Sequence, residues 1–140
     1  MKKLVIIPIL LLIIISCSKS DNNDVLDYTN NHPELLGKWQ YTEFLGVNVG
    51  CVGCGPYLIT NGYTINFSNN GNFTSTELAD YPTGTFVVSA SDQMTLTYNS
   101  ATSPTVVKVK EILNLTTSGV VLNPIPTCYE GCAERFEKLP

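Results

Sequence analysis

The stretch YTINFSNNGNFTSTE (residues 63–77) carries the clearest structural pattern in the chain. Its first five residues place Tyr63, Ile65 and Phe67 on one face, with polar residues between them, which is typical of a strand with one buried side. The turn SNNG that follows ends at Gly71, and glycine adopts the positive φ of such turns at no steric cost. The remaining six residues are again extended. We therefore predict a β-hairpin here.

Runs of similar composition continue on both sides of this hairpin, separated by Gly, Asn, Ser and Pro. Helical periodicity is essentially absent, and short turns between successive strands favour an up-and-down arrangement. The predicted fold class is all-β, a small antiparallel up-and-down barrel of about eight strands. The predicted strands are 37–45, 63–67, 72–77, 84–90, 93–98, 105–115, 120–124 and 132–140.

Met1 is followed by two lysines, an apolar run over 4–15, and then Ser16 and Cys17. The apolar run is too short to cross a bilayer as a helix, and the pattern is typical of a secretory signal. The residues IISC (14–17) resemble the lipobox of bacterial lipoproteins. That resemblance implies a diacylglycerol on Cys17, cleavage before it and N-acylation, and several acyl chains anchor a protein stably.

Three segments follow from this interpretation. Residues 1–16 are expected to be a signal peptide that is removed, 17–34 a lipidated flexible tether, and 35–140 one barrel domain. By resemblance to the known sorting rule, Ser18 favours the outer membrane of the bacterial cell envelope. Whether the domain faces the periplasm or the cell surface stays open.

Charge limits the partners that this chain can have. The formal net charge is −4 with eight basic and twelve acidic residues, and removing Lys2 and Lys3 leaves six basic residues and a net charge of −6. Nucleic-acid binding needs clustered basic residues, so we expect none. Lys108 and Lys110 lie close together on one strand face and are expected to be solvated. The expected partners are the membrane, an envelope protein or a small hydrophobic ligand, with the protein itself monomeric.

No constellation in the sequence predicts catalysis. His32 is the single histidine and lies in the expected tether, where it cannot be held beside a nucleophile. The acids Glu43, Glu77, Asp80 and Glu111 are scattered, and each is expected to be solvated. We therefore predict a protein that is not an enzyme and that has no cofactor and no metal.

Four cysteines remain beside Cys17, and they predict two disulfides in an exported protein. If the barrel closes, the loop after the first strand lies beside the start of the last strand. A nested pairing, Cys51 with Cys132 and Cys54 with Cys128, is then favoured over two local bridges. A thiol–disulfide redox centre at Cys51 and Cys54 and a four-cysteine zinc site are weaker hypotheses, because no helix start follows the C-x-x-C and the compartment is oxidising.

The strand pattern resembles the lipocalin-like domain of bacterial outer-membrane lipoproteins. That family has G-x-W near the start, a hairpin of the form Y-x-F-x-x-x-G-x-F, a G-x-(Y/F) strand and an L-T-(L/Y) strand. The resemblance implies a lipid-anchored antiparallel barrel but no particular ligand. The matching positions are Gly37, Trp39, Phe67, Gly71, Phe73, Gly84, Phe86, Leu96 and Tyr98.

We expect a binding or scaffolding role, with either a small apolar ligand in the mouth of the barrel or a partner at its disulfide-tied end. One alternative is a structural or interaction lipoprotein with a filled barrel and no ligand. A second is a thiol–disulfide redox protein that acts through Cys51 and Cys54. The side chains expected to line the barrel interior and the ligand are Trp39, Tyr41, Phe67, Phe73, Phe86, Met94 and Leu96.

Overall fold

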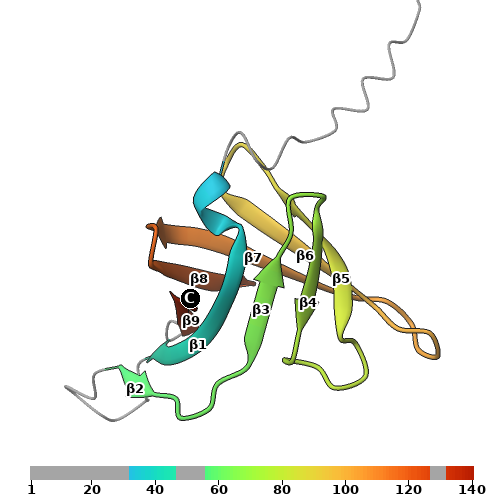
Figure 1. Cartoon of the computed structure of the whole chain (residues 1–140), viewed down its shortest axis with the longest axis horizontal. Coiled ribbons are helices and arrows are strands. Elements are labelled where there is room, and N and C mark those ends of the chain that lie inside the picture. The colour runs from blue at the N-terminus through green and yellow to red at the C-terminus, as the bar shows by residue number, and fades with distance from the viewer. Residues whose placement is uncertain (1–31, 47–55, 127–131) are drawn as a thin grey trace, which may run out of the picture.

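The computed structural model describes residues 32–46, 56–126 and 132–140. These residues form one short 3-10 helix and nine strands (Figure 1). No helix in the described ranges has the length and hydropathy of a membrane span. The elements are η1 Pro33–Leu35, β1 Gly37–Gly46, β2 Tyr57–Leu58, β3 Thr64–Phe67, β4 Asn72–Ser75, β5 Thr83–Val88, β6 Gln93–Asn99, β7 Val106–Leu115, β8 Gly119–Ile125 and β9 Cys132–Lys138.

Eight of the strands close into an antiparallel barrel. β1 pairs with β3, the strands from β3 to β9 pair in chain order, and β9 pairs back with β1. That closing register runs from Trp39 opposite Lys138 to Gly46 opposite Cys132. β2 adds two residues to β1 beyond the part of β1 that pairs with β3. The predicted fold class is confirmed, and all eight predicted strands are present within two residues at each end.

Two elements were not predicted, η1 and β2. η1 includes Pro33 and Glu34, which the composition of the sequence places in the tether. It belongs to the barrel because Leu35 is buried in the core and the indole Nε1 of Trp39 donates a hydrogen bond of 2.7 Å to the Leu35 carbonyl. This contact fixes the chain just before β1, so the barrel starts earlier than composition suggested.

Alternation with a period of two builds the core. In β5 the buried positions are Gly84, Phe86 and Val88, and in β6 Met94, Leu96 and Tyr98, with exposed or half-exposed residues between them. Directly opposite pairs such as Phe86 and Leu96 therefore point to the same interior. The complete core set is Leu35, Trp39, Ile65, Phe67, Phe73, Phe86, Val88, Met94, Leu96, Tyr98, Ile112, Val120, Leu122 and Phe136.

Two glycines are required by the geometry. Gly71 has φ +76° in the turn between β3 and β4, as the SNNG pattern predicted. Gly84 lies under the ring of Phe73, because a Cβ atom there would stand 2.5 Å from Phe73 Cζ and 2.3 Å from the Thr97 carbonyl oxygen. The missing side chain makes room for a ring at the centre of the core.

The barrel has two ends that differ in construction. The turns between β3 and β4, β5 and β6, and β7 and β8 lie together with η1, and we call this the helix end. His32 enters there, with its Nε2 3.2 Å from Asp92 Oδ1 in the turn before β6. The opposite end, where β1 ends and β9 begins, is called the polar end.

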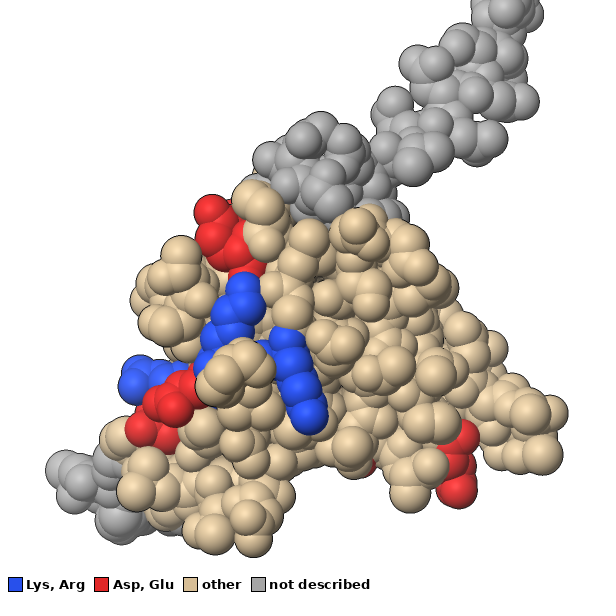
Figure 2. Space-filling model, in the orientation of Figure 1, with Lys and Arg blue, Asp and Glu red and all other residues tan. Residues whose placement is uncertain are grey.

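Charge is distributed unevenly among the strands. β3, β4, β5 and β6 contain no Lys, Arg, Asp or Glu, and the surface over them is largely uncharged in Figure 2. The charged residues of the barrel strands belong to β1, β7 and β9. Some of these charges point inward, and they make up the site described next.

Candidate functional site

The first half of β7 has its polarity reversed. Val107 points outward and is 58% exposed, whereas Lys110 points inward and is 3% exposed. The register requires this, because Lys110 lies opposite Met94 and Lys108 opposite Leu96, and both of those β6 residues are core. Ile112, two residues further along, is in the core as well, so the period of two places all three β7 side chains inside.

The expectation that Lys108 and Lys110 are solvated is wrong for Lys110 and only partly right for Lys108, whose side chain is about a third exposed. The spacing of the two lysines correctly predicts that they share a face. Solvent exposure is the expectation for that face because charged residues are almost never fully buried unless they are paired. The partners that make burial acceptable come from distant parts of the chain.

Glu77 is one of these partners. It lies between β4 and β5, where its backbone N–H donates a 3.1 Å hydrogen bond to Ser75 Oγ. Its carboxylate accepts a 2.6 Å hydrogen bond from Lys108 Nζ and another from the hydroxyl of Tyr98. The expectation of a solvated carboxylate is therefore wrong for Glu77, whose side chain is mostly buried.

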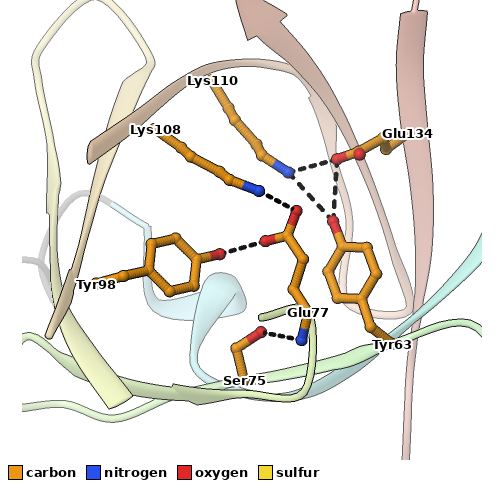
Figure 3. A network of polar contacts seen from close by, with 7 residues as sticks. All are labelled: Tyr63, Ser75, Glu77, Tyr98, Lys108, Lys110 and Glu134. Carbon is orange, nitrogen blue, oxygen red and sulfur yellow. Dashed lines mark hydrogen bonds and ion pairs between the residues drawn. The ribbon is translucent and has the colours of Figure 1, made fainter. Parts of the chain in front are cut away.

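Glu134 on β9 is the second partner. Its Oε2 accepts hydrogen bonds from Lys110 Nζ and, at 3.2 Å, from the hydroxyl of Tyr63. Lys110 Nζ also donates to the Tyr63 hydroxyl at 3.2 Å. The six side chains converge from five different parts of the barrel (Figure 3). We call them the polar cluster: Tyr63, Glu77, Tyr98, Lys108, Lys110 and Glu134.

Burial and charge shift the pKa values of this cluster. Burial, followed by the neighbouring charge of Glu134, raises the pKa of Tyr63 far above its usual range. Burial and the contact with Glu77 do the same to the pKa of Tyr98. Burial by itself would raise the pKa of Glu77, but Lys110 and the hydrogen bonds from Lys108 and Tyr98 outweigh it and lower the pKa below 4.5. Both tyrosines are therefore neutral donors and Glu77 is a carboxylate at neutral pH.

A hollow of about 260 Å³ opens beside the cluster at the polar end. Its charged walls carry both lysines and both glutamates. Its remaining walls come from the neighbouring parts of β7 and β8, where Val109 and Ile125 lie opposite each other in the register. The lining residues are Glu77, Val107, Lys108, Val109, Lys110, Pro124, Ile125 and Glu134. The site combines paired charges with a small apolar wall.

The seven residues expected to line an apolar ligand lie inside the barrel, mostly toward the helix end. Six of them are at most 2% exposed, and Tyr41 is half-buried. Their rings pack on one another, with centroids 4.8 Å apart for Phe67 and Phe86 and 5.2 Å for Tyr41 and Tyr63. None of them lines the hollow at the polar end. Their role as ligand contacts stays a prediction.

The predicted sulfur sites lie mostly outside the described residues, which is the case for Cys17, Cys51, Cys54 and Cys128. Cys132 is described, is the first residue of β9 and is not free. It stands opposite Gly46, the last residue of β1. Within the described part of the chain, no three His, Cys, Asp or Glu side chains gather in a way that could hold a metal ion.

Comparison with known proteins bears on the fold. No protein-family model matches the chain, and no curated protein matches it. Among solved structures, a lipocalin-like protein from Bacteroides uniformis is similar, with a TM-score of 0.52 and 18% sequence identity over 76% of this chain and 99% of the other. The fold is lipocalin-like. At this identity the similarity concerns the fold alone.

Proposed function

We propose that this protein is a lipid-anchored binding module of the bacterial envelope, with its ligand site at the polar end of the barrel. The observation that carries the proposal is that a buried lysine, Lys110, and three partly buried charged side chains, those of Glu77, Lys108 and Glu134, are paired beside a hollow. Burying paired charges contributes little to stability compared with apolar side chains of similar volume. Ionisable groups with shifted pKa values in a concave site are candidates for function.

The anchor rests on the N-terminal sequence. A short basic segment, an apolar run and the lipobox-like residues ending at Cys17 support lipidation and an outer-membrane location. These residues precede the described part of the chain. The proposal assigns a binding role to the site and no catalysis.

The cysteines are proposed to join the two strands that close the barrel. The register places the end of β1 beside the start of β9, which supports Cys51 with Cys132 and Cys54 with Cys128. Each bridge would close a loop of roughly 80 residues, worth about 4 kcal/mol on the chain-entropy model. A redox role for Cys51 and Cys54 is the rival assignment of the same thiols.

Native mass spectrometry of the unreduced protein tests these proposals together. We expect a chain that starts at Cys17, carries acyl groups, has no free thiol and holds a small molecule in part of the population. Peptide mapping without reduction should link Cys51 to Cys132. A separate peptide containing a Cys51–Cys54 bridge would contradict the nested pairing.

A matched pair of variants locates the ligand. Lys110→Met removes a buried ammonium at the polar end, and Lys38→Met makes the same change at an exposed position near the helix end. We expect the bound molecule to be lost from the first variant and kept in the second. A ligand that survives in both variants would contradict a site at the polar end.

A filled barrel without a ligand is the second candidate function. The close ring packing of the core at the helix end favours it, because those contacts need no ligand to complete them. The absence of any bound molecule in the native spectrum, together with no binding in titrations, would support this scaffold function.

A further inference from the structure

The unused hydrogen-bonding capacity of the polar cluster indicates what kind of molecule it would hold. A lysine ammonium has three N–H donors and a carboxylate has two acceptor oxygens. Lys108 Nζ donates to Glu77 alone among the described residues, and Lys110 Nζ donates to Glu134 and Tyr63. Three N–H donors of the two lysines therefore have no partner within residues 32–46, 56–126 and 132–140.

An acceptor in the same cluster is also unused. Both contacts of Glu134 use its Oε2 atom, so Oε1 accepts no hydrogen bond from the part of the chain that the structure describes. Figure 3 shows the ammonium groups of Lys108 and Lys110 pointing toward the carboxylates of Glu77 and Glu134. The site thus offers donors on one side and an anionic acceptor on the other.

Charge balance restricts the ligand further. The cluster holds two lysines and two glutamates, all paired, with both tyrosines neutral, so its net charge is zero. Placing a ligand of net charge in this partly desolvated space would cost free energy that no partner offsets. A ligand with one group of each sign would satisfy the unused donors and the unused acceptor and would leave the balance unchanged.

We infer that the polar end binds a small zwitterion of the α-amino acid or short-peptide class, and this inference rests on the proposed function of that site. The ligand carboxylate would accept hydrogen bonds from Lys108 and Lys110, and its ammonium would donate to Glu134 Oε1. Its side chain would contact Pro124, which lines the hollow and lies opposite Lys110 in the register of β7 and β8. The volume of the hollow, about 260 Å³, limits the ligand to an amino acid or a short peptide.

Three probes with the same branched hydrocarbon tail test the ligand class. L-leucine carries both charges, isocaproate lacks the amine, and isopentylamine lacks the carboxylate. Each can be titrated into the purified protein while the backbone amides of Lys108, Lys110 and Glu134 are followed by heteronuclear NMR. We expect leucine to bind at least about tenfold more tightly than either analogue, because each charge-assisted contact is worth about that factor.

A variant shows whether Glu134 recognises the ammonium. Glu134→Gln is nearly isosteric and keeps an acceptor, but it removes the negative charge. We expect leucine binding to weaken to the level of isocaproate in this variant, while isocaproate itself binds no less tightly than before. Lys38→Met serves as the control and should leave all three affinities unchanged.

The outcomes separate the inference from the proposed function. If isocaproate or isopentylamine binds as tightly as leucine, the zwitterion class is wrong and the polar end remains a binding site. If leucine binds with the stated preference but Glu134→Gln does not remove that preference, the assigned contact is wrong. If none of the probes shifts the amides of the polar cluster, both this inference and the ligand site of the proposed function are overturned.

Discussion

The two halves of the barrel interior are filled by side chains of different kinds. Toward the helix end, Phe67, Phe73 and Phe86 fill the space with ring contacts at 4.8–6.2 Å. Toward the polar end, the space is filled by charged and hydroxyl side chains that need specific partners. The apolar half needs only volume and hydrophobicity, whereas the polar half depends on the placement of each atom. Apolar packing and specific polar contacts are thus separated along the barrel axis.

The largest expected effect tests the apolar half. Phe73→Ala should lower the free energy of unfolding by about 4 kcal/mol, because it removes a ring that is 1% exposed and leaves a cavity over Gly84. Urea denaturation measures the change. Leu58→Ala, at a residue that is 78% exposed, is the control and should change it by less than about 0.5 kcal/mol. Equal losses in the two variants would mean that the core does not lie where we place it.

A smaller effect is expected in the polar half. Lys110→Met should cost about 2 kcal/mol because it leaves the Glu134 carboxylate without its ammonium partner, in a place where water reaches it only in part. Adding Glu134→Leu should restore at least about 1 kcal/mol, since the stranded charge is then removed. The same denaturation series reports both values. Losses that simply add would show that the two side chains are not coupled.

The smallest expected effect depends on pH. The pKa of Glu77 in the folded protein lies below its ordinary value of 4.5, so as pH falls the unfolded chain takes up the proton first. The stability contributed by this carboxylate is therefore present above about pH 4.5 and is lost as pH falls through the lower folded value. Glu77→Gln should flatten the acid side of the stability curve between neutral pH and about pH 3. If the acid slope is unchanged in this variant, the Glu77 carboxylate does not stabilise the folded protein through its contacts with Lys108 and Lys110.

The apolar half could be predicted from the sequence, and the polar half could not. Period-two alternation placed Phe67, Phe73 and Phe86 inside because burial of an apolar ring needs no particular partner. Lys108 and Lys110 show the same alternation, in phase with Ile112, and this phase is the one signal that could have placed them inside. Their partners Glu77 and Glu134 are 31 and 24 residues away along the chain. Only the register across the closed barrel brings them together.

The closing pair of strands could be predicted in topology but not in detail. If an up-and-down sheet with an even number of strands closes, the last strand lies antiparallel beside the first, so the pairing of β1 with β9 follows from closure of the barrel. The irregularities do not follow from it. The register shifts between Tyr41 and Glu43 in β1 and between Ile112 and Asn114 in β7, and neither stretch contains a glycine or proline to mark it. The shift in β7 leaves Leu113 exposed.

The register of β1 with β9 also places both ends of the described domain side by side. The backbone N–H of Leu139 donates to the Lys38 carbonyl at 2.8 Å, and Lys138 Nζ donates to the Glu34 carbonyl at 2.9 Å. Anything joined to the barrel through its backbone, whether an anchor ahead of His32 or a fusion after Pro140, is therefore attached at the helix end. The attachment point and the polar site lie at opposite poles, so a molecule can approach the site from the side facing away from that attachment.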